Sequence, residues 1–315
     1  MIELEPRVRD TSADESERAA SSVSSVGWHC GWLPLIFLPS AVLLFVPSSW
    51  PPWAFMWMLA SAIYCGCKWL TWRRTPTPGV SVWRNLGYLL AWPGMDAPSF
   101  LDPHQTAHIR QPSIREWFSA TAKLVLGIGL FFGVARLIPP DFPYLIGWVG
   151  MIGIVMILHF GIFHLLSCLW RRTGVNAKQL MDVPLTSTSL SEFWGKCWNA
   201  AFRDLTYRFL FRPLTPMFGA RGAILVAFVF SGLVHDVVIS YPARGGYGGP
   251  TLFFALNGAT ILVERSKIAR KIGLGNGLLG RLFTMLVLLG LVSSLFHPPF
   301  VVRIVVPFMR AMGAT

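Results

Sequence analysis

Charged side chains are scarce in this sequence, because Asp, Glu, Lys and Arg together make up only 13% of its 315 residues. Soluble globular domains carry about 25% charged residues. Hydrophobic residues make up 53% of the chain, with 14 Trp and 23 Phe. So little charge cannot cover that much apolar surface in water. The composition therefore excludes an ordinary soluble domain and predicts an integral membrane protein.

Cysteine is also sparse, and its spacing excludes two kinds of site. None of the five cysteines forms a Cys-x-x-Cys pair or a zinc-ligand spacing. An odd number within or beside apolar runs is typical of buried thiols rather than of a disulfide framework. We therefore expect no metal centre at these positions, which are Cys30, Cys65, Cys67, Cys168 and Cys197.

The start of the chain lacks the apolar core of a secretory signal. Residues 1–27 contain six acidic residues and three arginines. A signal peptide needs a basic start followed by an apolar run. We therefore predict a disordered cytosolic tail over 1–27 and a single membrane-embedded domain over 28–315.

Long apolar runs dominate the rest of the sequence. A helix that spans a bilayer needs about 20 mainly apolar residues. The sequence therefore predicts an all-α, polytopic transmembrane bundle of about 7–8 spans. The candidate spans are 32–50, 52–72, 117–138, 143–170, 222–241, 250–264 and 282–298, with a further short run at 300–309.

The net charge of +12 is distributed unevenly among the predicted loops. With a cytosolic N-terminus, loops 68–116, 171–221 and 265–281 hold nineteen Lys and Arg residues, whereas the opposite loops hold two. The positive-inside rule accounts for this asymmetry, so no nucleic-acid partner is needed to explain it. A basic cytosolic surface would also attract a phosphate-rich substrate. A bacterial inner membrane and an endoplasmic reticulum both fit this topology.

Two of the cytosolic segments are expected to lie along the membrane surface. Residues 68–116 contain an apolar stretch that is broken by Pro and Gly and too short to span. Over 186–205, Ser189 and Glu192 form a capping-box pattern, and apolar residues follow at helical spacing. This pattern predicts one continuous interfacial helix. No internal repeat is present, which disfavours a repeat-built transporter.

Polar residues inside predicted spans are costly and are candidates for function. They are Lys123, His159, His164, His235, Asp236 and Asn257, with Glu264 at a span edge. A neutral His235, deep in its span, can accept a proton from a hydroxyl. A structural histidine inside the bundle is the alternative. Ser231, four residues earlier, shares its helical face and allows either a Ser–His pair or close helix packing.

Other polar residues support weaker hypotheses. His159, His164 and His235 could supply a haem-ligand pair, although the spacing of the first two places them on different faces. On the helical wheel of 186–205, Asn199 falls on the polar side. Periodicity alone therefore indicates a solvated surface position for Asn199.

At these residues the chain resembles a known group. SEFWGKCWNAAFRDLTYRFLFRPL (191–214) is similar to the FWGRRWN-type segment of wax synthase-like proteins in the membrane-bound O-acyltransferase superfamily. SGLVHD (231–236) resembles the histidine segment of that family, and LFFALNGATILVE (252–264) resembles the stretch that follows it. The resemblance covers about residues 80–300. It departs at Cys197, because the family often has two basic residues where this chain has Lys196 and Cys197.

The resemblance implies an activity and a site. Family members transfer an acyl group from acyl-CoA to a hydroxyl inside a tunnel through the membrane. His235 would be the general base, and Asn199 would hold the thioester or position the reacting groups. No cofactor is implied beyond acyl-CoA as co-substrate, and the acceptor would be a lipophilic alcohol. Substrate-binding roles are expected for Trp194, Lys196, Trp198, Arg203, Ser231 and Asp236.

One hypothesis from another class remains open. A non-enzymatic polytopic protein, either a transporter or a haem-binding bundle, would share the same apolar spans. A Soret band would favour haem, whereas a tunnel that converges on His235 would favour acyl transfer.

Overall fold

The computed structural model describes residues 31–103 and 109–315, so the predicted tail over 1–27 lies outside the described residues. Those residues form helices and connecting loops, and no strand occurs among them. The all-α prediction is therefore confirmed. The helices are α2 (Leu33–Phe45), α3 (Pro52–Arg73), α4 (Val82–Ala91), α5 (Ala97–Leu101), α6 (Ile114–Ile128), α7 (Pro143–Val155), α8 (Phe163–Arg172), α9 (Leu190–Glu192), α10 (Ala200–Thr206), α11 (Arg212–His235), α12 (Tyr241–Ala243), α13 (Gly249–Glu264), α14 (Lys267–Lys271), α15 (Gly277–Leu295), α16 (Pro298–Phe300) and α17 (Val306–Ala311).

Four continuous helical segments in the described chain are long and apolar enough to cross a membrane. They are Ile114–Leu137, Pro143–Arg172, Ala200–Ala243 and Gly277–Leu295. Four of the seven predicted spans therefore have a counterpart. α2 has 13 residues and α13 has 16, which is short of the roughly 20 that span a bilayer. The structure thus shows four candidate spans among the described residues, and the predicted seven or eight stay a prediction.

The outer surface of these helices is apolar. Leu145 and Ile152 on α7, and Leu282, Leu286 and Leu289 on α15, are each more than half exposed. A soluble monomer rarely leaves so many large apolar side chains in contact with water. Hydrocarbon around these helices removes that cost, so the surface is that of a membrane protein.

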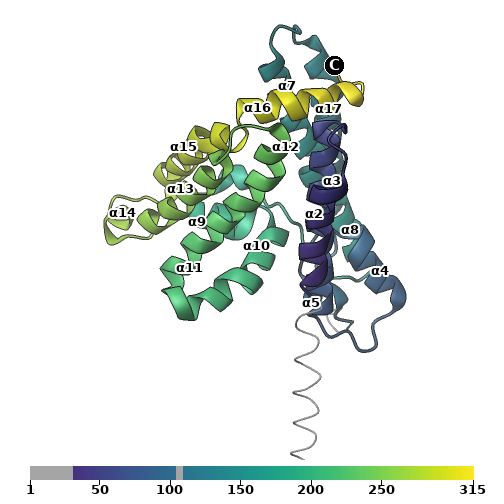
Figure 1. Ribbon diagram of the computed structural model, residues 1–315. Coiled ribbons are helices and arrows are strands. Elements are labelled where there is room, and N and C mark those ends of the chain that lie inside the picture. Colours follow the sequence, from purple (N-terminus) through teal and green to yellow (C-terminus); the bar gives the residue numbers. More distant parts are fainter. Residues whose placement is uncertain (1–30, 104–108) are drawn as a thin grey trace, which may run out of the picture.

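α11, α13 and α15 form one group of helices, and α2 and α3 run beside each other in another part of the molecule (Figure 1). α16 and α17 lie across one end of the bundle (Figure 1). α11 and α13 approach closely because Gly232 leaves room: a Cβ at that position would lie 2.5 Å from Cα of Thr251. Small residues allow this kind of contact between membrane helices.

α11 changes direction at Gly219, whose backbone has φ 65° and ψ 170°. This conformation is accessible almost only to glycine. The break separates the first part of α11, at the lower end of the green helices in Figure 1, from the part that leads to His235. The segment 200–243 is therefore bent and does not form one straight span.

The predicted continuous helix over 186–205 is wrong. α9 begins with the expected cap, in which Oγ of Ser189 accepts from the Glu192 N–H at 2.9 Å. A π-helical turn, η6 (Phe193–Cys197), follows. The backbone then becomes extended at Trp198 and left-handed at Asn199, and α10 starts a new helix. Apolar spacing at 3.6 residues per turn cannot reveal such a break, because both halves keep the pattern.

Candidate active site

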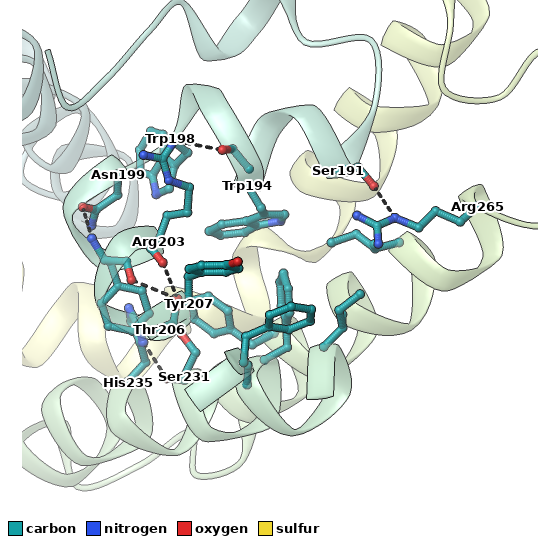
Figure 2. Close-up of a pocket in the computed structure, with 18 residues that line it drawn as sticks. Ser191, Trp194, Trp198, Asn199, Arg203, Thr206, Tyr207, Ser231, His235 and Arg265 are labelled. Atoms are coloured by element: carbon teal, nitrogen blue, oxygen red, sulfur yellow. Dashed lines mark hydrogen bonds between the residues drawn. The ribbon is translucent and has the colours of Figure 1, made fainter. Parts of the chain in front are cut away.

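A cavity of about 310 Å³ lies between the two motif segments recognised in the sequence. Trp194, Trp198 and Asn199 line it from one segment, and Ser231 and His235 line it from α11. Figure 2 shows Asn199 and His235 on the same side of the view and the bond between Arg265 and Ser191 on the other side. A volume near 300 Å³ is at the lower end of the range for small-molecule sites. The structure therefore brings the predicted base and the predicted asparagine into one cavity.

His235 has one ring nitrogen fixed by the backbone. Nδ1 lies 2.7 Å from the carbonyl oxygen of Ser231, one turn earlier on α11. A carbonyl oxygen only accepts hydrogen bonds, so Nδ1 carries the proton in the neutral ring. Nε2 then holds the lone pair and is the atom that can accept a proton. The rings of Phe254, at 4.5 Å, and Phe202, at 6.2 Å, surround the imidazole.

Asn199 is held in a left-handed conformation with φ 47°. Asparagine adopts this conformation more readily than most residues. Its Oδ1 accepts from the Phe202 N–H at 3.2 Å and so caps α10. The cap determines which way the amide points and leaves Nδ2 available to donate to a bound molecule. The interpretation of Asn199 as solvated surface is wrong, because the helix break turns its side chain into the cavity.

Ser231 lines the same cavity, and its hydroxyl is buried without a hydrogen-bond partner. His235 binds the backbone oxygen of Ser231 and not its hydroxyl. The two side chains therefore do not form the Ser–His nucleophile pair that their spacing allows. A buried hydroxyl without a partner is costly unless a ligand supplies one. Ser231 is thus a candidate hydrogen-bond donor to whatever occupies the cavity.

The two tryptophans of the motif form the aromatic wall of the cavity. Nε1 of Trp194 donates to Oδ1 of Asn257 at 3.1 Å. Trp198 is nearly parallel to the rings of Phe193, at 5.6 Å, and His159, at 6.3 Å. Trp198 directly precedes Asn199, so this stack fixes the backbone at the asparagine. His159 thereby lies against the motif segment in the structure.

A second cavity of about 640 Å³ adjoins the first, and Arg203 lines both. Arg203 donates to Asp204 through Nε at 2.8 Å and to the carbonyl oxygen of Gly195 at 2.9 Å. The lining of the second cavity is strongly polar. Its basic residues are Arg110, Arg171, Lys178, Lys196 and Arg203, and its acidic residues are Asp96, Glu116, Asp182 and Asp204. Predicted residues Lys196 and Arg203 therefore meet here, although Lys196 does not line the first cavity.

Asp236 does not line either cavity. Its carboxylate points to the start of α13, where it accepts from the Gly248 N–H at 2.9 Å and the Thr251 N–H at 3.1 Å. Oδ1 also accepts from the Ser240 hydroxyl at 2.8 Å. The structure therefore places Asp236, which was predicted to bind substrate, in the contact between the end of α11 and the start of α13.

One group among the described residues offers three possible metal ligands. The ligand atoms of Glu116, His164 and Cys168 lie within 4.8 Å of one another. The guanidinium group of Arg171, however, donates to Glu116 and lies 3.5 Å from Sγ of Cys168. A cation is thus already present where a metal ion would sit. The group is better described as an ion-pair network between α6 and α8.

Sequence reasoning did not single out Phe254 or Met181, and it named Asn257 only as a polar residue within a predicted span. Phe254 packs on the His235 ring, and Sδ of Met181 accepts from the Asn199 N–H at 3.1 Å. Both are ordinary apolar residues in the sequence, so no local signal distinguishes them. Asn257 did carry a signal, because it is a polar side chain in an apolar helix.

The fold and the cavity are those of a helical membrane protein in which a half-buried histidine and a half-buried asparagine line one cavity. The model of the membrane-bound O-acyl transferase family matches residues 177–256, which include both motif segments. The resemblance stated from the sequence to this family and to its wax synthase-like members is therefore confirmed.

Two relatives illustrate the similarity. A long-chain-alcohol O-fatty-acyltransferase of Simmondsia chinensis is 36% identical over 100 residues, which are 29% of this chain and 28% of the relative. Acyl-CoA–sterol O-acyltransferase 1 of Arabidopsis thaliana is 32% identical over 89 residues, which are 26% of each chain. The matched part thus spans less than a third of either relative.

Proposed function

We propose that this protein transfers an acyl group from acyl-CoA to the hydroxyl of a lipophilic alcohol, giving a wax-type, sterol or terpenoid ester. The observation that carries the proposal is the meeting of the two motif segments in one cavity. Nδ1 of His235 and Oδ1 of Asn199 make hydrogen bonds to the backbone. Nε2 of His235 and Nδ2 of Asn199 have no bond within the described chain and are free to bind substrate. The names of the two relatives, an alcohol acyltransferase and a sterol acyltransferase, point in the same direction.

The proposed reaction uses His235 twice. The alcohol gives its proton to Nε2 as its oxygen attacks the thioester carbonyl carbon. When the tetrahedral intermediate collapses, the C–S bond breaks, and the leaving sulfur of CoA takes the proton back from Nε2. The hydrogen bond from Nδ1 to the Ser231 carbonyl holds the required tautomer and stabilises the imidazolium. Neither a further cofactor nor a covalent enzyme intermediate takes part.

The negative charge on the carbonyl oxygen needs donors that are in place before the reaction. The Nδ2 group of Asn199 is one, and the unpartnered hydroxyl of Ser231 is a second. Donors that are already oriented in a water-poor site stabilise such an oxyanion without reorganisation. The aromatic lining by Trp194, Trp198 and Phe254 supports the exclusion of water, which would otherwise hydrolyse the thioester.

The second cavity would hold the phosphate-bearing part of acyl-CoA. Lys196 and Arg203 belong to the motif, and Lys178 and Arg110 add positive charge to the same cavity. Arg203 lines both cavities, so a thioester that extends from one to the other would pass this side chain. The two cavities together would form the predicted tunnel. With the N-terminus in the cytosol, the polar cavity would face the compartment that contains acyl-CoA.

The test is an assay of ester formation in membranes that contain wild-type protein or the His235→Ala variant in equal amounts. Each preparation receives labelled acyl-CoAs with a panel of long-chain alcohols, sterols and diacylglycerol. We expect the wild type to form an ester with at least one alcohol and the variant to form none above background. Ester formation by the variant at the wild-type rate would refute the assigned base, and no ester from any pair would refute the function.

A further inference from the structure

α13 is bonded at its start to the residue that follows the catalytic histidine. The carboxylate of Asp236 accepts from the backbone N–H groups of Gly248 and Thr251, and the Thr251 hydroxyl donates to it as well. A negative charge at a helix N-terminus is favourable because the free N–H groups there are partly positive. The end of α11, and with it His235, is therefore attached to the start of α13.

The other end of α13 is bonded to the asparagine segment. Glu264, the last residue of α13, is only 4% exposed. Its two carboxylate oxygens accept from the backbone N–H groups of Leu190, at 2.9 Å, and Ser191, at 3.1 Å. These two residues open the segment that continues through η6 to Asn199. A buried carboxylate needs such donors to offset its lost hydration.

A third contact lies midway along α13. Asn257 has no exposed surface. Its Oδ1 accepts from Nε1 of Trp194, and its Nδ2 donates to the carbonyl oxygen of Phe253 at 2.9 Å. Asn257 and Glu264 are seven residues apart and so lie on one face of the helix. That face binds the segment 190–199 at two places.

We propose that α13 sets the separation between His235 and Asn199, and that Asn257 is a positioning residue that acts through Trp194. The catalytic part of this inference rests on the proposed acyl transfer. Neither Asn257 nor Glu264 lines the cavity, so neither can touch the substrate. Both act by fixing the segment that carries Asn199, while Asp236 fixes the helix that carries His235. This assigns a role to Asp236, Asn257 and Glu264.

Precise placement matters for this reaction because reacting atoms must lie about 3–3.5 Å apart, and a misplacement of about 1 Å can cost on the order of a hundredfold in rate. Removing the Asn257 amide leaves the Trp194 N–H buried without a partner. The tryptophan would shift to find a new partner and would move η6 with it. The turnover number would then fall more than the affinity for acyl-CoA.

The experiment compares Asn257→Leu, which is close in size, with the control Thr260→Val on the same helix. The Thr260 hydroxyl donates to the carbonyl oxygen four residues earlier, as Asn257 does, but it does not bind the motif segment. Backbone amide hydrogen exchange over 190–202 and steady-state kinetics are measured for both variants in lipid nanodiscs. We expect Asn257→Leu to speed exchange in 190–202 and to lower kcat by about tenfold with little change in KM, and Thr260→Val to do neither.

Two further variants separate positioning from general destabilisation. Asn257→Asp, protonated in this buried place, keeps an oxygen acceptor for Trp194 and is expected to retain most of the activity. In a Trp194→Phe background the hydrogen bond is already absent, so Asn257→Leu is expected to cause little further loss.

Unchanged exchange over 190–202 in Asn257→Leu would overturn the inference, as would faster exchange with an unchanged kcat. Equal further losses in the wild-type and Trp194→Phe backgrounds would also overturn it. If the wild type forms no ester, the proposed function fails, whereas the exchange comparison still decides whether Asn257 holds this segment.

Discussion

At the scale of single residues, the proposed function gives the Asn199 side chain a chemical task beside its structural one. Oδ1 caps α10, and the residue lines the cavity. Its left-handed backbone conformation is one that few other residues adopt at low cost. A substitution can separate these two tasks, because aspartate keeps the oxygen that caps α10 and lacks the N–H donor of the amide.

Asn199→Asp is therefore expected to keep the thermal stability of the wild type within about 1 kcal/mol. Its rate of ester formation is expected to fall by about 10²–10³, because a carboxylate replaces an oxyanion donor. Thermal unfolding in detergent and initial rates at saturating acyl-CoA measure the two effects. Asn199→Gly, which tolerates positive φ and also lacks the donor, is the matched control and should lose a similar amount of activity. A rate near that of the wild type in both variants would remove Asn199 from the chemistry.

Ser231→Ala is expected to separate stability from activity in the same way. The hydroxyl makes no hydrogen bond within the described protein, so its removal leaves no protein group unpaired. We expect unfolding temperatures that are unchanged or slightly higher, and a rate of ester formation lowered by about tenfold. A variant with full activity would show that the hydroxyl does not bind the reacting group.

The sequence indicated the two residues that share the cavity with unequal strength. His235 was a candidate because a titratable side chain stands out in an apolar helix. Asn199 was a candidate only through the family resemblance, since helical periodicity assigned it to the surface. The conformations of Trp198 and Asn199 depend on packing against Phe193, His159 and Met181, and the last two of these partners come from other segments of the chain.

At the scale of helices, the break at Gly219 determines the direction of the second part of α11. A Cβ at Gly219 would meet no atom within 4 Å, so an alanine there would suffer from backbone strain and not from a clash. Gly219→Ala is expected to lower the free energy of unfolding by about 1–3 kcal/mol. Gly290→Ala in α15 is the control, because a Cβ there also meets no atom within 4 Å but the backbone is helical. This substitution should be neutral or raise the free energy of unfolding by up to about 1 kcal/mol. Equal unfolding temperatures for the two variants in the same detergent would contradict the assigned strain.

The start of the motif segment should respond to acid. The backbone N–H and the hydroxyl of Thr188 donate to the Glu192 carboxylate and lower its pKa below the usual value of 4.5. A lowered pKa in the folded state means that the stabilisation is present above pH about 4.5 and is lost as the pH falls through the folded-state value. The exposure of this group keeps the effect small. Unfolding temperatures of the wild type and Glu192→Gln should converge as the pH is lowered, and a constant difference between pH 7 and pH 3 would contradict this assignment.

The helices themselves were partly predictable. The spans near 117–138, 143–170, 222–241 and 282–298 follow from apolar runs that are long enough by themselves. Hydropathy also predicted spans at 32–50 and 250–264, but the helices there have only 13 and 16 residues. α2 stops at Phe45 before Pro47, and α13 begins at Gly249 after a glycine-rich turn. The π-helical turns leave no mark in the hydropathy pattern.

At the scale of the whole molecule, the chain is arranged around one polar and one largely apolar cavity that share Arg203. The apolar outer surface fits hydrocarbon, and the proposed phosphate-bearing donor would bind at the basic residues of the polar cavity. Composition predicted the membrane class because it is a property of the whole chain. The pairing of the two cavities could not be predicted, since it depends on how segments 92–96, 109–116, 171–182 and 196–204 fold together.

The most direct test of the central claim compares acyl-CoA binding and ester formation in the wild type and in His235→Gln, both purified and reconstituted in nanodiscs. The claim predicts that the variant binds acyl-CoA with an affinity close to that of the wild type, because the donor cavity is intact. It also predicts a rate of ester formation lower by about 10²–10⁴, the usual contribution of a general base. Retained binding with lost transfer would establish His235 as the base, whereas transfer within tenfold of the wild-type rate would contradict the account.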